Sequence, residues 1–190
     1  MTKKKIKELI AEAACGLKVV CIYMVYNENP YRLIPLKTSD RLFLAIFEDD
    51  FIFDGFRISR FRDAEHMWNK NDKEDEIIRS EGLFYNFQVP EINVENWQAV
   101  FEGLQGIGKN ILVEHQTLDG EGDYVIVGKV ERVCKKWVYM RHVNANGIWE
   151  PEPYLVPYTE VNAVRFNSRY VDIFSKYIPE APDATDRSSL

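Results

Sequence analysis

Hydrophobic and polar positions follow the same order in two stretches of the chain, residues 1–68 and 92–166. Each stretch opens with apolar residues spaced i, i+3, i+4 and i+7, which is typical of a helix with one buried stripe. About five short apolar runs follow, separated by Asn, Asp, Gly and Pro, which is typical of β-strands joined by tight turns. A recurring order of this kind indicates an internal repeat. The pattern therefore predicts a mainly β (α+β) chain made of two similar units.

The two predicted helices are recognised by their apolar stripes and by the glycine that follows each of them. The first stripe consists of Ile6, Leu9, Ile10 and Ala13, and the second of Trp97, Val100, Phe101 and Leu104. Gly16 and Gly106 follow these stripes at the position where a left-handed residue commonly ends a helix. We expect each helix to end at its glycine.

The segments that follow the first turn of each half align without a gap, residues 31–35 with 124–128. Pro35 in the first half corresponds to Gly128 in the second. Both residue types are poor in strand interiors and mark bends or bulges. A small barrel has to bend its strands sharply to close, so we expect a bend at each of these two positions.

A helix followed by five bent strands resembles the layout of the Sm-like and SH3-like small barrels. The second half carries the resemblance best, because Leu118-Asp119-Gly120 falls at its first turn and Gly128 at its second-strand bend, similar to the first Sm sequence motif. The resemblance implies two tandem five-stranded Sm-like/SH3-like barrels, each preceded by an α-helix. The whole chain is also similar to uncharacterised bacterial proteins of tandem small-barrel type.

Members of the Sm-like family typically assemble into rings and bind RNA through loop residues. The Asp and Asn that the family uses to hold a base are missing from residues 133–136, and its late Arg-Gly pair is missing from residues 59–62 and 156–159. The resemblance therefore implies the fold of the family without its RNA-binding residues.

A charged run at residues 69–81 separates the two halves, and an apolar, aromatic segment follows it. The expected organisation has four parts: a first helix and barrel (1–68), a charged linker and apolar connector (69–91), a second helix and barrel (92–166), and a C-terminal helix with a polar tail (167–190).

The formal net charge is −6, and residues 1–82 carry 14 basic and 15 acidic side chains while residues 83–190 carry 10 and 15. Neither half has the positive balance that a general nucleic-acid binder needs to neutralise phosphates. No apolar run approaches the ~20 residues of a membrane-spanning helix, and the N-terminal lysines precede an amphipathic stripe rather than a signal sequence. Cys15, Cys21 and Cys134 lack CxxC spacing and suit free thiols, so we expect a cytoplasmic location without membrane association.

No motif commits the chain to a reaction, and we assign no catalytic residue, metal ligand or cofactor. His66, His115 and His142 lie far apart in sequence, without a second ligand at metal-binding spacing. His115 and His142 fall on strands of the same half, so a zinc or catalytic pair is an alternative to isolated histidines on strand faces.

The stretch 56–62 interleaves arginines with aromatic residues and is the best nucleic-acid candidate, because arginine pairs with phosphates and phenylalanine stacks on bases. The candidate residues are Arg57, Arg60, Phe61 and Arg62. Strand alternation offers an ordinary alternative, in which Arg57 and Ser59 simply face solvent.

The longest insertion relative to the first half is the predicted hairpin 144–154, which carries Trp149 and Tyr154. Aromatic residues on a proline-stiffened hairpin are good anchors for a protein partner, although Trp149 is alternatively a cap on its own barrel. The favoured function is non-enzymatic protein–protein binding by a monomer or small homo-oligomer. The alternatives are an Sm-like RNA-binding regulator, and an enzyme or small-molecule binder with a site between the barrels.

Overall fold

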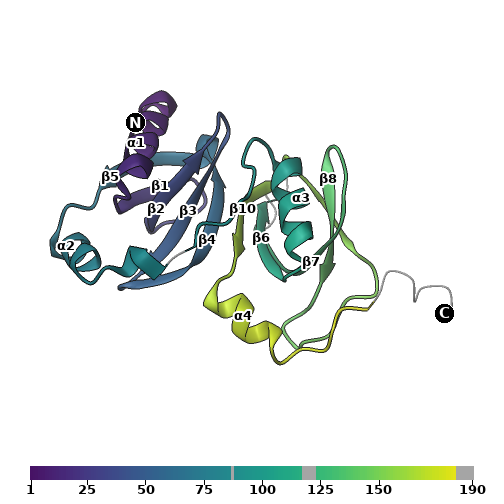
Figure 1. Cartoon of the computed structure of the whole chain (residues 1–190). Coiled ribbons are helices and arrows are strands. Elements are labelled where there is room, and N and C mark those ends of the chain that lie inside the picture. The colour runs from purple at the N-terminus through teal and green to yellow at the C-terminus, as the bar shows by residue number, and fades with distance from the viewer. Residues whose placement is uncertain (87, 117–122, 183–190) are drawn as a thin grey trace. The chain divides into compact units, whose positions relative to one another are not determined.

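The computed structural model describes residues 1–86, 88–116 and 123–182, and it divides into two compact units, Met1–Asn96 and Trp97–Leu190 (Figure 1). These described residues form ten β-strands and four α-helices, which confirms the prediction of a mainly β chain. The turn predicted at Leu118-Asp119-Gly120 lies outside the described residues. Among the residues described, no helix is both long enough and apolar enough to cross a membrane.

Unit 1 starts with a helix, continues with five strands and ends with short helices. Its elements are α1 (Lys3–Gly16), β1 (Val20–Met24), β2 (Tyr31–Thr38), β3 (Leu42–Asp49), β4 (Ile52–Arg60), η1 (Phe61–Asp63), β5 (Ala64–Asn69), α2 (Lys73–Ser80) and η2 (Leu83–Asn86). Unit 2 also starts with a helix and ends with one. Its elements are α3 (Trp97–Ile107), β6 (Ile111–Gln116), β7 (Asp123–Val133), β8 (Trp137–His142), β9 (Tyr154–Pro157), β10 (Val161–Phe166) and α4 (Arg169–Ser175).

The strands of the two units follow the same spatial order relative to their order in the chain. In unit 1 the order is β5-β1-β2-β3-β4, and in unit 2 it is β10-β6-β7-β8-β9. Neighbouring strands within each unit are antiparallel. Among the described residues no ladder joins β4 to β5 or β9 to β10, so the strands of neither unit close into the expected barrel.

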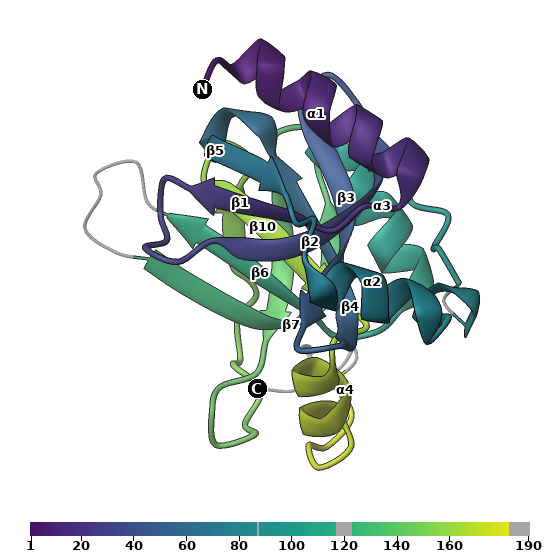
Figure 2. The ribbon, with the colours of Figure 1, turned by 90° about the vertical axis from the view of Figure 1, so that its left-hand side faces the viewer.

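The stripe predicted for the first helix faces the core of unit 1. Ile6, Ile10 and Ala13 are buried, and α1 lies across the strands and packs against β2 and β5 (Figure 2). The helix ends at Gly16 as predicted, but this glycine is not its left-handed residue. The helix includes Gly16, and Leu17 takes the left-handed conformation, with φ 46°.

The stripe predicted for the second helix is buried as well, and α3 packs against β7 and β8. Gly106 does not end this helix, which continues to Ile107. Gly108, with φ +71°, takes the left-handed position instead, and its N–H donates to the carbonyl oxygen of Leu104. A glycine two residues further along therefore satisfies the last carbonyls of the helix.

Both positions at which a bend was expected interrupt the regular ladders. The register of the β2–β3 ladder shifts just after Pro35. Strand β7 passes from its partner β6 to its partner β8 at Gly128, which is paired with both Ile111 and His142. A Cβ atom on Gly128 would lie 1.8 Å from the carbonyl oxygen of Arg141, so only glycine fits there.

Replacing Gly128 by alanine is expected to lower the free energy of unfolding by about 3 kcal/mol or more, because the added methyl group meets backbone that cannot move aside without breaking the β7–β8 ladder. Urea denaturation followed by circular dichroism measures this change.

Gly106→Ala is the matched control, because a Cβ at this helical position has no neighbour within 4 Å. It is expected to raise the free energy of unfolding by about 0.5–1 kcal/mol. Equal effects of the two substitutions would contradict the close approach at Gly128.

Candidate functional site

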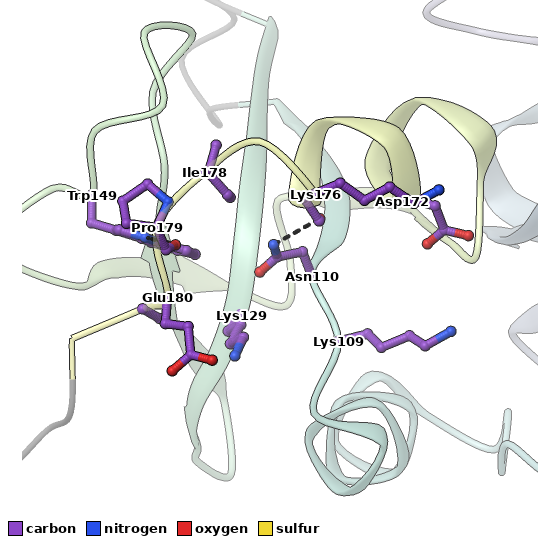
Figure 3. Close-up of a pocket in the computed structure, with 11 residues that line it drawn as sticks. Lys109, Asn110, Lys129, Trp149, Asp172, Lys176, Ile178, Pro179 and Glu180 are labelled. Atoms are coloured by element: carbon purple, nitrogen blue, oxygen red, sulfur yellow. Dashed lines mark hydrogen bonds between the residues drawn. The ribbon is translucent and has the colours of Figure 1, made fainter.

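A pocket of about 470 Å³ lies within unit 2 beside α4 (Figure 3). Its walls come from the segment before β6, from β7, from the β8–β9 connection, and from α4 with the chain that follows it. The lining residues with polar or aromatic side chains include Lys109, Asn110, Lys129, Trp149, Lys176 and Glu180. The volume falls in the range typical of small-ligand sites in proteins.

Trp149 builds one wall of this pocket. Its indole Nε1–H donates to the carbonyl oxygen of Pro179 at 2.9 Å, and its ring packs with Phe174 and Ile178 on the buried side chains beneath. These are Leu112, Val127, Val143 and Val171. The tryptophan is partly buried and ties the segment after α4 to its own unit, as the capping alternative describes. The other expected partner contact, Tyr154, is 47% exposed.

Asn110 lines the pocket and carries an unpaired polar atom. The residue is only 9% exposed, and its amide Nδ2 donates to the Ser175 hydroxyl at 2.8 Å. The Ser175 hydroxyl donates in turn to the Val171 carbonyl oxygen, so it accepts from Asn110, and this fixes the orientation of the amide. The amide oxygen Oδ1 is buried and has no hydrogen-bond partner among the described residues.

Figure 3 shows the Asn110 amide oxygen directed away from the dashed hydrogen bond of its amide nitrogen. A buried acceptor without a partner costs about 1–3 kcal/mol, which a ligand with an N–H or O–H donor would recover on binding. Because the Ser175 hydroxyl already donates to a backbone carbonyl, this serine is not placed as a nucleophile. The Ser175 hydroxyl serves instead to orient the Asn110 amide.

The charged side chains around the pocket are only partly neutralised. Lys109 donates to the Asn167 side-chain oxygen at 3.2 Å. Lys129 and Lys176 form no ion pair with any residue that the structure describes, and the same holds for the pocket acids Asp172 and Glu180. With Lys109 the pocket is lined by three ammonium groups against two carboxylates, a positive balance that attracts an anionic group of a ligand.

A second cluster lies on β6, β7 and β9 and is centred on His115, which is 4% exposed. The imidazole stacks on Tyr124 with a centroid distance of 5.4 Å, and the Tyr154 ring lies 6.2 Å away. Its Nδ1 atom is 3.9 Å from the Glu160 carboxylate. Neither ring nitrogen has a hydrogen-bond partner in the described part of the chain. Burial lowers the pKa of His115 below its ordinary value.

The alternative of a His115–His142 pair is not supported by the register of the strands. His115 lies opposite Tyr124 and His142 opposite Gly128, four positions further along β7. The His142 Nδ1–H donates to the Val127 carbonyl oxygen at 3.0 Å, in the tautomer that this contact requires. Within the described ranges, no group of three or more His, Cys, Asp or Glu side chains is placed to hold a metal ion.

Arg57, the first of the nucleic-acid candidates, is buried, and the alternative expectation that Arg57 and Ser59 face solvent is wrong. The guanidinium group lies 4.3 Å from the centre of the Tyr31 ring. It also donates to the Ser59 hydroxyl at 3.0 Å and to the Tyr26 hydroxyl at 3.2 Å. An arginine whose N–H groups donate to side chains of its own unit can be buried in a sheet. The alternation of inward and outward positions along a strand does not reveal such burial.

The other three candidates do not form a basic surface together. Arg60 is buried and paired with Asp63 at 2.6 Å. Phe61 is buried against Phe43 with a ring distance of 5.1 Å, which leaves Arg62 as the exposed side chain of the set. In the sequence, Asp63 lies three residues after Arg60, and this spacing is the feature that could have indicated the pairing.

Searches against protein-family models, curated proteins and solved structures gave no match to this chain.

Replacing Trp149 by phenylalanine is expected to lower the free energy of unfolding by about 1 kcal/mol, because the ring contacts are largely kept while the hydrogen bond to Pro179 is lost. The same substitution is expected to accelerate amide hydrogen exchange at Glu180 and Ala181, which follow the anchored residue. Trp137→Phe changes an exposed tryptophan of the same unit and serves as the control, with an expected effect within about 0.5 kcal/mol. Similar exchange rates in the two variants would show that Trp149 does not anchor this segment.

His115 is expected to make stability depend on pH. Because its pKa in the folded chain lies below the ordinary value of 6.5, its contribution to stability is fully present above pH 6.5. The contribution is lost as the pH falls from 6.5 towards the folded pKa, since the unfolded chain binds the proton first. Urea unfolding between about pH 5 and 8 should show a smaller loss of stability on acidification for His115→Phe than for the unmodified chain. Parallel curves for the two proteins would contradict this assignment.

Proposed function

We propose that the chain is a non-enzymatic binding module whose unit 2 pocket recognises an acidic peptide segment of a partner protein. The observation that carries the proposal is the buried, unpartnered amide oxygen of Asn110, a residue of the pocket that Lys129 and Lys176 also line. A ligand for this pocket needs a hydrogen-bond donor and an anionic group within a short distance of each other.

A peptide supplies both groups within a few residues. Its backbone N–H is a donor for the Asn110 oxygen, and an aspartate or glutamate side chain is an anion for the lysines. The apolar wall of Trp149, Ile178 and Pro179 offers contact area to the rest of the segment. A pocket of this composition therefore favours a peptide over a purely ionic ligand such as phosphate, which cannot use the apolar wall.

The matching strand orders of the two units, each with a leading helix, support the proposal of two tandem repeats related to the Sm-like and SH3-like small barrels. Small β-rich domains commonly bind peptides through loops and aromatic surfaces. The burial of Arg57, Arg60 and Phe61 disfavours the RNA-binding alternative. Because Cys15, Cys21 and Cys134 are free thiols, we also propose a cytoplasmic location for the chain.

Nuclear magnetic resonance titration of the labelled full chain tests the proposal. The probe is an acetylated, amidated peptide containing two glutamates, and a peptide with lysines in their place is the matched control ligand. The glutamate peptide is expected to shift the backbone resonances of Asn110, Lys129 and Lys176, and its affinity should fall with added salt. The lysine peptide is expected to leave these resonances unchanged.

Lys129→Gln and Lys176→Gln are each expected to weaken binding of the glutamate peptide by roughly threefold to tenfold, because each removes one attractive charge. Lys135→Gln is the matched control, since Lys135 is exposed between β7 and β8 and does not line the pocket. Equal weakening by Lys135→Gln, or no resonance shift at the pocket, would refute the proposal.

A further inference from the structure

We propose that His115, Tyr124, Tyr154 and Glu160 form a second binding site, which accepts a primary ammonium group. This site differs from the Trp149 pocket in its residues and in its chemistry, because it selects a cation and not an acidic segment. It therefore goes beyond the proposed function and does not depend on it.

The first observation is the imidazole without partners. A neutral imidazole carries one N–H donor and one acceptor nitrogen, and both of these atoms in His115 are buried without a hydrogen bond among the described residues. The Glu160 carboxylate lies 3.9 Å from Nδ1, so a small movement of either side chain completes a hydrogen bond from Nδ1–H. In this tautomer Nε2 remains an acceptor and needs a donor that the described residues do not supply.

The second observation is the pair of tyrosine rings that cover the imidazole. Tyr124 and Tyr154 are 44% and 47% exposed, although the histidine between them is almost fully buried. The faces of tyrosine rings attract cations. Tyr154 stands at the start of β9, the outer strand of unit 2, where rotation of its ring opens the imidazole to solvent.

The third observation is the charge at the cluster. Glu160 supplies a negative charge, and in the described residues its nearest basic group is the imidazole of His115, 3.9 Å away. His115 is itself neutral near pH 7 because burial lowers its pKa, so it does not repel a cation. In the part of the chain that the structure describes, no lysine or arginine forms an ion pair with Glu160 or a cation–π contact with either tyrosine. The site thus has the carboxylate, the rings and the acceptor that an ammonium ion requires, and lacks the cation.

The unpaired nitrogen makes the site selective among cations. A primary ammonium donates hydrogen bonds to Nε2 and to the Glu160 carboxylate while its carbon chain lies against the rings. A quaternary ammonium has no donor and leaves Nε2 unpaired. The same ammonium chemistry is found in a lysine side chain of another protein and in a free polyamine.

The test is a titration of the full chain, labelled with ¹⁵N at histidine, in which the imidazole nitrogen resonances of His115 are observed at neutral pH. The first probes are n-butylammonium and tetramethylammonium. We expect n-butylammonium to shift the His115 nitrogens and to bind roughly tenfold more tightly than tetramethylammonium, because it alone donates a hydrogen bond to the imidazole. Equal affinities for the two ions, or His115 nitrogens that do not move, would overturn the proposal.

Two variants separate the site from general effects on the fold. His115→Phe keeps an aromatic ring but removes the acceptor, and binding observed through the Tyr154 resonances should be lost. His66→Phe replaces an exposed histidine of unit 1 and should bind like the unmodified chain. Backbone spectra of both variants establish that they are folded. Retained affinity in folded His115→Phe would also overturn the proposal.

Acidification and the choice of ligand complete the experiment. Below the pKa of His115 the imidazolium has no acceptor and repels the cation, so affinity for n-butylammonium should fall as His115 becomes protonated.

Spermidine and an acetylated Gly-Lys-Gly amide distinguish the two sources of the ammonium group. Tighter binding of the peptide identifies a lysine side chain as the ligand, and tighter binding of spermidine identifies a polyamine. Failure of both would contradict the site, whereas the glutamate-peptide titration decides the Trp149 pocket separately.

Discussion

The backbone contact between Gly128 and the carbonyl group of Arg141 is the constraint on which the arrangement of unit 2 depends. At this point β7 stops pairing with β6 and starts pairing with β8. Residues before and after Gly128 therefore contribute to different candidate sites. Tyr124 lies before it and covers His115, while Lys129 follows it and lines the pocket beside Trp149. A single close approach of two strands thus sets the positions of both candidate sites.

The two sites share a physical feature, which is a buried polar atom left without a partner. Folded proteins pair nearly all of their buried polar groups, so each exception asks for an explanation. In the pocket the exception is the side-chain amide oxygen of Asn110, and in the cluster it is the imidazole of His115. Their surroundings differ, because unpaired lysines accompany the amide and a carboxylate with two tyrosines accompanies the imidazole. The ligands proposed for the two sites therefore carry opposite charges.

The sequence was most informative where local pattern and tertiary packing agree. The apolar stripes at residues 6–13 and 97–104 predicted two buried helix faces, and Pro35 and Gly128 marked the irregular points of the strands. Arg57 was misread because strand alternation does not reveal that Tyr26 and Ser59 supply its hydrogen bonds from within the unit. Closed barrels were expected from the bends, but a bend does not determine whether the outer strands of a sheet meet.

The candidate sites were harder to predict than the helices and strands. Trp149 and Tyr154 were identified from their place on the predicted hairpin insertion, and each belongs to one of the two candidate sites. Asn110 was not identified, and His115 was considered only as half of a pair with His142, because an unpaired atom is a property of the folded chain. Asn110 belongs to no recognisable sequence motif. The orientation of its amide depends on Ser175, which lies 65 positions away. No local pattern reports a contact over that separation.

The shortness of β9 also bears on how another chain can associate with unit 2. This outer strand has four residues and ends in Pro157, which has no backbone N–H to offer. Short edges with proline discourage the addition of a further strand and so protect a β-rich protein from edge-to-edge aggregation. Tyr154 and Leu155 nevertheless remain exposed on the same strand. Another chain that associates at this edge therefore contacts mainly side chains, and such contacts are specific to a partner. Backbone hydrogen bonds, which any extended chain could form, contribute less.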